Sequence, residues 1–141
     1  MKKLLSLIII FISVLFVPIE AEQPSCTITL KILNNKHNAP FYIAIYDTDK
    51  SFLNPTLARY ALIIESNEED IYIINGIIAG NYALVIFQDI NQNGQLDKGL
   101  FGIPREPYGF SNNPWMLIGP PSYQDCEFTL LDHTTLEIKL K

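Results

Sequence analysis

Four residues with oxygen-bearing side chains and one glycine have the spacing of a calcium loop in this sequence: Asp89, Asn91, Asn93, Gly94 and Asp97. Calcium prefers carboxylate, amide and carbonyl oxygens, and its loops place them at positions one, three, five and nine around a glycine that turns sharply. The pattern therefore predicts that this stretch binds calcium.

The rest of the ligand set is less complete. Position seven of such a loop supplies a backbone carbonyl, here that of Gln95. Position twelve carries a bidentate glutamate in an EF-hand, but Leu100 stands there, which excludes the helix-loop-helix form. A sixth oxygen must come from Glu106, from another backbone carbonyl or from water. Two carboxylates among the ligands give a low site charge, so we expect a Kd of roughly 10⁻⁴ to 10⁻³ M. The competing interpretation is a metal-free turn built from Asx hydrogen bonds.

Aromatic residues interleaved with glycine and proline follow the calcium motif. The candidate ligand-binding residues of this segment are Phe101, Arg105, Tyr108, Phe110, Asn112 and Trp115. One interpretation is an aromatic platform that stacks on a sugar or grips an apolar peptide. The other, which we favour, is a loop folded over the end of the domain, because such residues commonly pack locally in long ordered loops.

No catalytic constellation accompanies these residues. His37 and His133 fall in polar turns at opposite ends of the chain, and neither has an activated serine or cysteine motif near it. The acidic turn at 68–70 is typical of a solvated surface. The sequence therefore favours a non-enzymatic module, and the alternative is a hydrolase-like or carbohydrate-binding enzyme whose site lies in residues 101–115.

The beginning of the chain has the form of a secretory signal peptide. Lys2 and Lys3 precede an apolar run over residues 4–17, and the small residue Ala21 follows. The run is shorter than the ~20 residues that a membrane-spanning helix needs. We expect cleavage after Ala21 and export to the periplasm or the extracellular space. The mature chain, residues 22–141, has the length of a single domain.

The charge balance limits the partners. Without Lys2, Lys3 and Glu20 the count falls from 10 basic and 15 acidic residues to 8 and 14, a net charge of −6. The basic residues are scattered along the sequence, so we expect neither nucleic-acid binding nor attraction to an anionic membrane. The expected partner is an unknown protein or glycan, with no membrane insertion after signal cleavage.

Apolar and polar residues alternate with the period of a half-buried strand in most of the mature chain. The predicted strands span residues 27–33, 41–47, 60–65, 70–75, 81–89, 123–131 and 134–140. Strands 60–65 and 70–75 have the form of a hairpin, and 81–89 is the expected central strand. Seven short strands without an amphipathic helix predict an all-β antiparallel sandwich with a long ordered loop at 89–115.

Cys26 and Cys126 are the two cysteines of the chain. Both fall on the apolar faces of their predicted strands, and an exported protein meets an oxidising environment. We therefore expect one disulfide, which in the chain-entropy model stabilises by up to ~4 to 5 kcal/mol for a loop of this size. The alternative is two buried free thiols.

Residues 80–113 carry a more specific pattern. It comprises the strand entry with Gly80 and Tyr82, the DxNxNG loop, and the pieces FGIP at 101–104 and YGFSN at 108–112. With these features the chain resembles the bacterial domain of unknown function 2141 family, small exported proteins, over most of its mature length. The resemblance implies a β-sandwich of immunoglobulin-like or prealbumin-like type and brings no catalytic residues.

Overall fold

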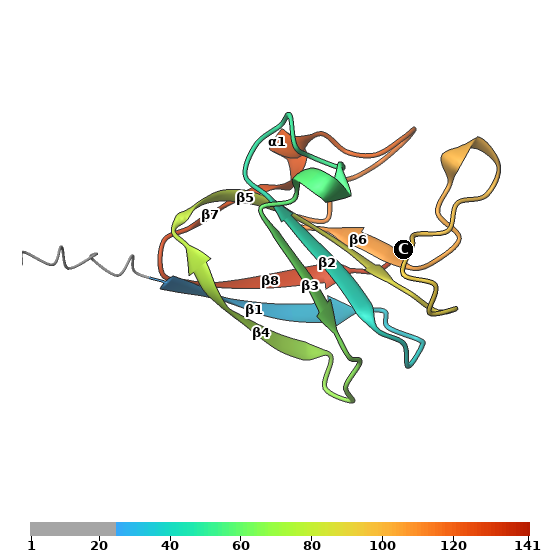
Figure 1. Ribbon diagram of the computed structural model, residues 1–141, viewed down its shortest axis with the longest axis horizontal. Helices are drawn as coiled ribbons and strands as arrows, with labels where there is room; N and C mark the ends of the chain where they lie inside the picture. Colours follow the sequence, from blue (N-terminus) through green and yellow to red (C-terminus); the bar gives the residue numbers. More distant parts are fainter. Residues whose placement is uncertain (1–24) are drawn as a thin grey trace, which may run out of the picture.

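The structure, a computed structural model, describes residues 25–141. The predicted signal peptide, residues 1–21, lies outside the described residues. Two β-sheets form the two layers seen in Figure 1. One sheet contains, in spatial order, β4 (Ile71–Ile78), β1 (Ser25–Leu33) and β8 (His133–Lys139). The other contains β3 (Tyr60–Ile64), β2 (Phe41–Tyr46), β5 (Gly80–Gln88) and β6 (Tyr108–Phe110), and β7 (Glu127–Leu130) also pairs with β5.

Helical structure within residues 25–141 is limited to short turns, which confirms the all-β prediction. These are the 3-10 turns η1 (Pro55–Leu57) and η2 (Leu100–Gly102) and the four-residue helix α1 (Tyr123–Cys126). In this part of the chain no helix has the length and hydrophobicity to cross a membrane. The central position of β5, which pairs with β2, β6 and β7, also matches the prediction for residues 81–89.

The pairing differs from the sequence prediction in three ways. The described residues form eight strands rather than seven, because β6 pairs with β5 over Val85 to Phe87. The sandwich is not wholly antiparallel, since β1 and β8 run parallel. The predicted hairpin of β3 and β4 is wrong: β3 pairs with β2 and β4 pairs with β1, so the acidic turn between them crosses from one sheet to the other.

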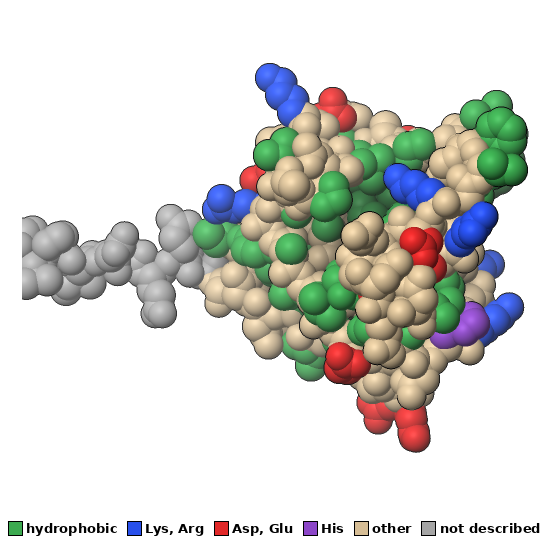
Figure 2. Space-filling model, turned by 45° about the vertical axis from the view of Figure 1, so that its right-hand side comes forward, with side chains coloured by type: hydrophobic (Ala, Val, Ile, Leu, Met, Phe, Trp, Pro, Cys, Tyr) green, Lys and Arg blue, Asp and Glu red, His purple; other side chains and the backbone are tan. Residues whose placement is uncertain are grey.

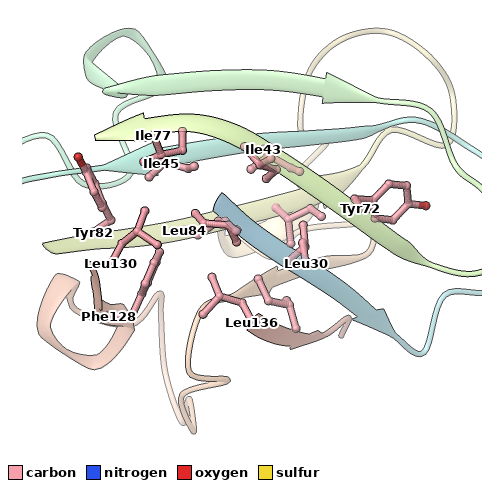
Figure 3. Packing of buried hydrophobic residues seen from close by; sticks show 14 of the residues in the cluster. Leu30, Ile43, Ile45, Tyr72, Ile77, Tyr82, Leu84, Phe128, Leu130 and Leu136 are labelled. Carbon is pink, nitrogen blue, oxygen red and sulfur yellow. The ribbon is translucent and has the colours of Figure 1, made fainter. Parts of the chain in front are cut away.

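The main core lies between the two sheets (Figure 3). Alternate residues of each strand face it, including Ile28 and Leu30 of β1, Ile43 of β2, and Leu84 and Ile86 of β5. Burying one such side chain contributes about 1.5 to 3 kcal/mol relative to leaving it exposed. The period-two pattern of the sequence therefore identified the residues that hold the sheets together.

A second apolar cluster covers the opposite face of β5. Its buried members are Tyr46, Ala83, Phe110, Tyr123 and Cys126. The short helix α1 contributes Tyr123 and Cys126, and it starts where the predicted strand 123–131 should have begun. Ser122 and Asp125 form a capping box, in which each side chain accepts the backbone N–H of the other residue. This capping box makes the start of the segment helical and leaves β7 to begin at Glu127.

The predicted disulfide between Cys26 and Cys126 is absent, and both residues are buried free thiols. Cys26 belongs to the core between the sheets, whereas Cys126 belongs to the cluster on the other face of β5. A sheet therefore separates the two sulfur atoms. Burial, with a smaller contribution from the Asp125 carboxylate, raises the pKa of the Cys126 thiol to about 12.

Candidate functional site

The predicted calcium loop starts from a buried point at the end of β5 that is anchored by hydrogen bonds. Gln88 and Asp89 are both inaccessible to solvent. The Gln88 amide donates to the carbonyls of His37 at 2.8 Å and Ala39 at 3.1 Å, and the backbone N–H of Asp89 donates to Pro40 at 2.9 Å. The first ligand position is therefore fixed by the sheet and by the loop between β1 and β2.

Backbone N–H groups hold the side-chain oxygens of the first half of the loop. The two carboxylate oxygens of Asp89 accept the N–H groups of Asn93 at 3.1 Å and Gly94 at 2.7 Å. Asn91 Oδ1 accepts the N–H of Asn93, and Asn93 Oδ1 accepts the N–H of Gln95, at 3.2 and 2.8 Å. Gly94 has a φ of +75°, which brings its N–H back to Asp89 without strain. The loop is thus ordered by its own side chains.

Asp97 joins this network from the far end of the loop. Its carboxylate accepts the side-chain amide of Asn91 at 2.6 Å and that of Asn93 at 3.2 Å. The structure therefore brings together the four predicted side-chain ligands, and Asn91, Asn93 and Asp97 lie within hydrogen-bond distance of one another. Gln95, the predicted carbonyl ligand, is exposed on the same turn.

Glu106 is nine-tenths buried and fastens the loop at both ends. Its Oε1 accepts the backbone N–H of Ile90 at 2.9 Å, and its Oε2 accepts that of Asp97 at 3.1 Å. The backbone N–H of Arg105 also donates to the carbonyl of Asp97 at 2.8 Å. Each carboxylate oxygen retains a lone pair that could face a metal ion. The two hydrogen bonds of Glu106 already account for the shape of the loop.

The donor set of this loop is mixed. Among the described residues no three His, Cys, Asp or Glu side chains lie together in a metal-binding group. A site here relies instead on amide oxygens beside Asp89 and Asp97. The loop is satisfied without an ion by its Asx turns, and it accepts a cation if the Asn91 and Asn93 amides turn their oxygens toward Asp97.

A small hairpin follows the loop. Its stem is closed by a bridge between Lys98 and Pro104, and the N–H of Gly99 donates to the carbonyl of Ile103 at 2.7 Å. The tip is apolar and exposed: 80% of Leu100 and 98% of Phe101 are accessible to solvent. Phe101 has a φ of 63°, a conformation that favours glycine.

The six predicted ligand-binding residues do not form one platform. Phe110 is buried in the second cluster, and the Tyr108 ring packs edge-on against it at 5.9 Å. Asn112 donates to the carbonyl of Glu127 at 2.7 Å. The Arg105 side chain lies over Gly99, where a Cβ would stand 3.2 Å from Nε.

Four of the six predicted residues are exposed, Phe101, Arg105, Asn112 and Trp115, and the two exposed aromatic residues lie on different loops. Phe101 is at the hairpin tip, and Trp115, 82% exposed, is on the loop before α1. The sequence prediction missed four apolar neighbours that share their exposure: Leu100, Ile103, Leu117 and Ile118. The available signal was their position in glycine- and proline-containing segments, outside any alternating run.

A comparison with family models matches residues 29–139 to the family described as an uncharacterized protein conserved in bacteria, DUF2141. The chain belongs to the DUF2141 family. The match runs from β1 to β8, so the calcium motif and the apolar hairpin both lie inside the DUF2141 domain. This confirms the resemblance drawn from residues 80–113. The comparisons with curated proteins and with solved structures found no match.

Proposed function

We propose that this DUF2141 protein is an exported, non-enzymatic accessory module that binds a partner through its loops and is stabilised by calcium. The ion is held by side-chain oxygens of Asp89, Asn91, Asn93 and Asp97 and by the carbonyl of Gln95. A sixth oxygen comes from Glu106, another backbone carbonyl or water. The sandwich is of the immunoglobulin-like or prealbumin-like type, and its place is the periplasm or the extracellular space.

The hydrogen-bond network of the loop is the observation that carries the calcium proposal. Backbone N–H groups orient Asp89, Asn91 and Asn93 and leave each oxygen a second lone pair. The backbone of the loop is already ordered, so binding costs little backbone entropy once the Asn91 and Asn93 amides have turned. A cation also offsets the negative charges of Asp89 and Asp97, the two carboxylates of the loop.

The binding role is supported by what the loops expose. Phe101 and Trp115 are large, apolar and accessible, while Arg105, Glu106 and Asn112 point to separate partners rather than into one cleft. Because Arg105, Glu106 and Asn112 do not converge, the alternative of a hydrolase-like enzyme in residues 101–115 is disfavoured. In such an enzyme an acid, a base and a polar contact must reach one substrate atom. The partner class expected from the sequence is a protein or a glycan.

Thermal unfolding in a calcium titration tests the calcium proposal. At 10 mM calcium a Kd of 10⁻⁴ to 10⁻³ M stabilises the folded state by roughly 1.4 to 2.7 kcal/mol, a rise of several degrees in Tm. Asp97→Asn should abolish most of that rise. Asp132→Asn, at an exposed aspartate outside the loop, should leave it unchanged. An unchanged Tm for the wild-type chain, or an equal rise in Asp97→Asn, contradicts the proposal.

A further inference from the structure

The hairpin tip presents apolar side chains in a way that fold stability does not explain. Leu100, Phe101 and Ile103 are exposed by 80, 98 and 62%. Phe101 also occupies the left-handed region at φ 63°, where a residue other than glycine is strained. An exposed phenyl ring on a strained turn gains nothing from the rest of the domain. Such a feature is typical of a contact surface for something outside the chain.

A second exposed apolar loop arises from the same part of the sandwich. It carries Trp115, Leu117 and Ile118, which are exposed by 82, 77 and 96%. Lys141 connects the bases of the two loops: its N–H donates to the carbonyl of Tyr108 at 2.9 Å, and its Nζ donates to Pro114 at 3.0 Å. In Figure 1 both loops extend to the same side of the two sheets.

Basic side chains surround the base of the hairpin. Lys98 and Arg105 lie on the two sides of its stem. Lys36 and Lys141 line a shallow hollow of about 200 Å³ beside Pro107, which follows the hairpin directly. Figure 2 shows lysine and arginine side chains below the apolar tip. Four of the eight basic residues of the mature chain therefore lie at this end, although they are far apart in sequence.

Two of the three nearby carboxylates are withdrawn from solvent, and the third, that of Asp97, is partly exposed. Asp89 and Glu106 are buried and bonded to backbone N–H groups, and the Asp97 carboxylate accepts the amides of Asn91 and Asn93. The outer surface of this end thus carries four basic side chains near one partly exposed loop carboxylate, in a chain of net negative charge. This local field attracts anionic groups within about one Debye length, roughly 10 Å at 0.1 M salt.

We propose that this end of the molecule docks on an anionic lipid bilayer. The apolar tips enter the headgroup region, and Lys98, Arg105, Lys36 and Lys141 face lipid phosphates. Two separate convex tips suit a bilayer, which deforms around them, whereas a protein partner needs a matching pocket for each. Proteins that anchor at the membrane interface insert aromatic and aliphatic side chains and keep basic side chains behind them at the level of the lipid phosphates. The inference rests on the loops being the binding surface. It replaces the protein or glycan expected from the sequence with a lipid surface, because basic residues that are scattered in the sequence lie together in the fold.

Vesicle flotation with the mature chain tests this inference. The vesicles contain phosphatidylcholine alone or with one third phosphatidylglycerol, and each is run in calcium and in chelator. We expect binding to the anionic vesicles and a blue shift in the emission of Trp115, the single tryptophan. Phe101→Ser or Leu100→Ser should weaken binding at least tenfold. Ile63→Ser, which removes a 62% exposed isoleucine from β3, is the matched control and should bind like the wild type.

The outcomes separate this inference from the calcium proposal. No flotation in either condition overturns the lipid inference, and so does flotation that Phe101→Ser and Leu100→Ser leave unchanged while both variants stay folded by circular dichroism. Without flotation, a dimer lost in Phe101→Ser assigns the tip to a second copy, and a glycan-array signal lost in Trp115→Ala assigns the surface to a sugar. Either result overturns the lipid inference. Flotation without a calcium-dependent rise in Tm supports the lipid inference and contradicts only the calcium proposal.

Discussion

The buried carboxylate of Glu106 accepts the backbone N–H of Asp97 at 3.1 Å. Its second oxygen accepts the N–H of Ile90, so one side chain joins the start of the 89–97 loop to its end. Glu106 also lies at the base of the hairpin that carries Phe101. The loop proposed to bind calcium and the tip proposed to meet a membrane therefore share one fastening point.

Replacing Glu106 with glutamine tests that fastening point. One backbone N–H would then face the amide nitrogen of the new side chain, and a buried donor without a partner costs about 1 to 3 kcal/mol. We expect the free energy of unfolding, measured with urea, to fall by this amount and the calcium affinity to fall with it. Glu68→Gln, in the exposed acidic turn, should change neither quantity. Equal stability of Glu106→Gln and the wild type would show that the two hydrogen bonds do not hold the loop.

Phe101→Gly should stabilise the protein. Glycine adopts a positive φ without strain, and the 98% exposed phenyl ring buries almost nothing that the substitution would lose. The expected gain is up to about 1 kcal/mol in the free energy of unfolding, reduced by the greater chain entropy of glycine. Leu100→Gly, at an exposed neighbour outside the left-handed region, should give no gain. A loss of stability in Phe101→Gly contradicts the inference that this turn serves a purpose other than folding.

Alkaline pH should destabilise the fold through Cys126 and Tyr82. Burial raises the pKa of Cys126 from 9.0 to about 12 and that of Tyr82 from 10.0 to about 12. The unfolded chain then releases these protons first, so the stabilising contribution is complete below pH 9 and is lost as pH rises toward 12. The slope is at most about 1.4 kcal/mol per pH unit for each group. Urea unfolding from pH 7 to 11 measures it, and Cys126→Ala should flatten the profile above pH 9. A wild-type profile with no slope between pH 9 and 11 contradicts the assignment.

Gly109 sets the distance between β6 and β8. A Cβ at this position would lie 2.5 Å from Ile138 Cγ2 and 3.3 Å from the carbonyl of Lys139. We expect Gly109→Ala to lower the free energy of unfolding by about 1 to 3 kcal/mol, because the neighbouring strand must move. Ile138→Ala removes the clashing methyl group, so the double variant should lose less than the sum of the two single losses. Strict additivity would show that the two residues do not collide.

Alternating burial made much of the fold predictable from sequence. Ile28 and Leu30 on β1, and Leu84 and Ile86 on β5, belong to runs that alternate with a period of two, and the core contains them. The exceptions arose where a local interaction outweighed that period. The Ser122 and Asp125 capping box turned the first part of a predicted strand into a helix. The three residues of β6 are too few to show alternation.

The candidate site was predictable in its ligands and less so in its surroundings. The spacing from Asp89 to Asp97 identified the side chains that converge, because the contacts are local in sequence. The separation of Cys26 from Cys126 by a sheet required the long-range topology. The same is true of the basic cluster, since Lys36 and Lys141 meet only when β1 and β8 pair in parallel.

A crystal structure of the protein grown in calcium, with anomalous diffraction data, tests the central claim most directly. We predict one anomalous peak inside the loop, with oxygens of Asp89, Asn91, Asn93 and Asp97 and the Gln95 carbonyl at about 2.3 to 2.6 Å. The Asn91 and Asn93 amides should have turned their oxygens toward the ion. A loop at saturating calcium that keeps its amide-to-Asp97 hydrogen bonds and shows no anomalous peak would contradict the claim.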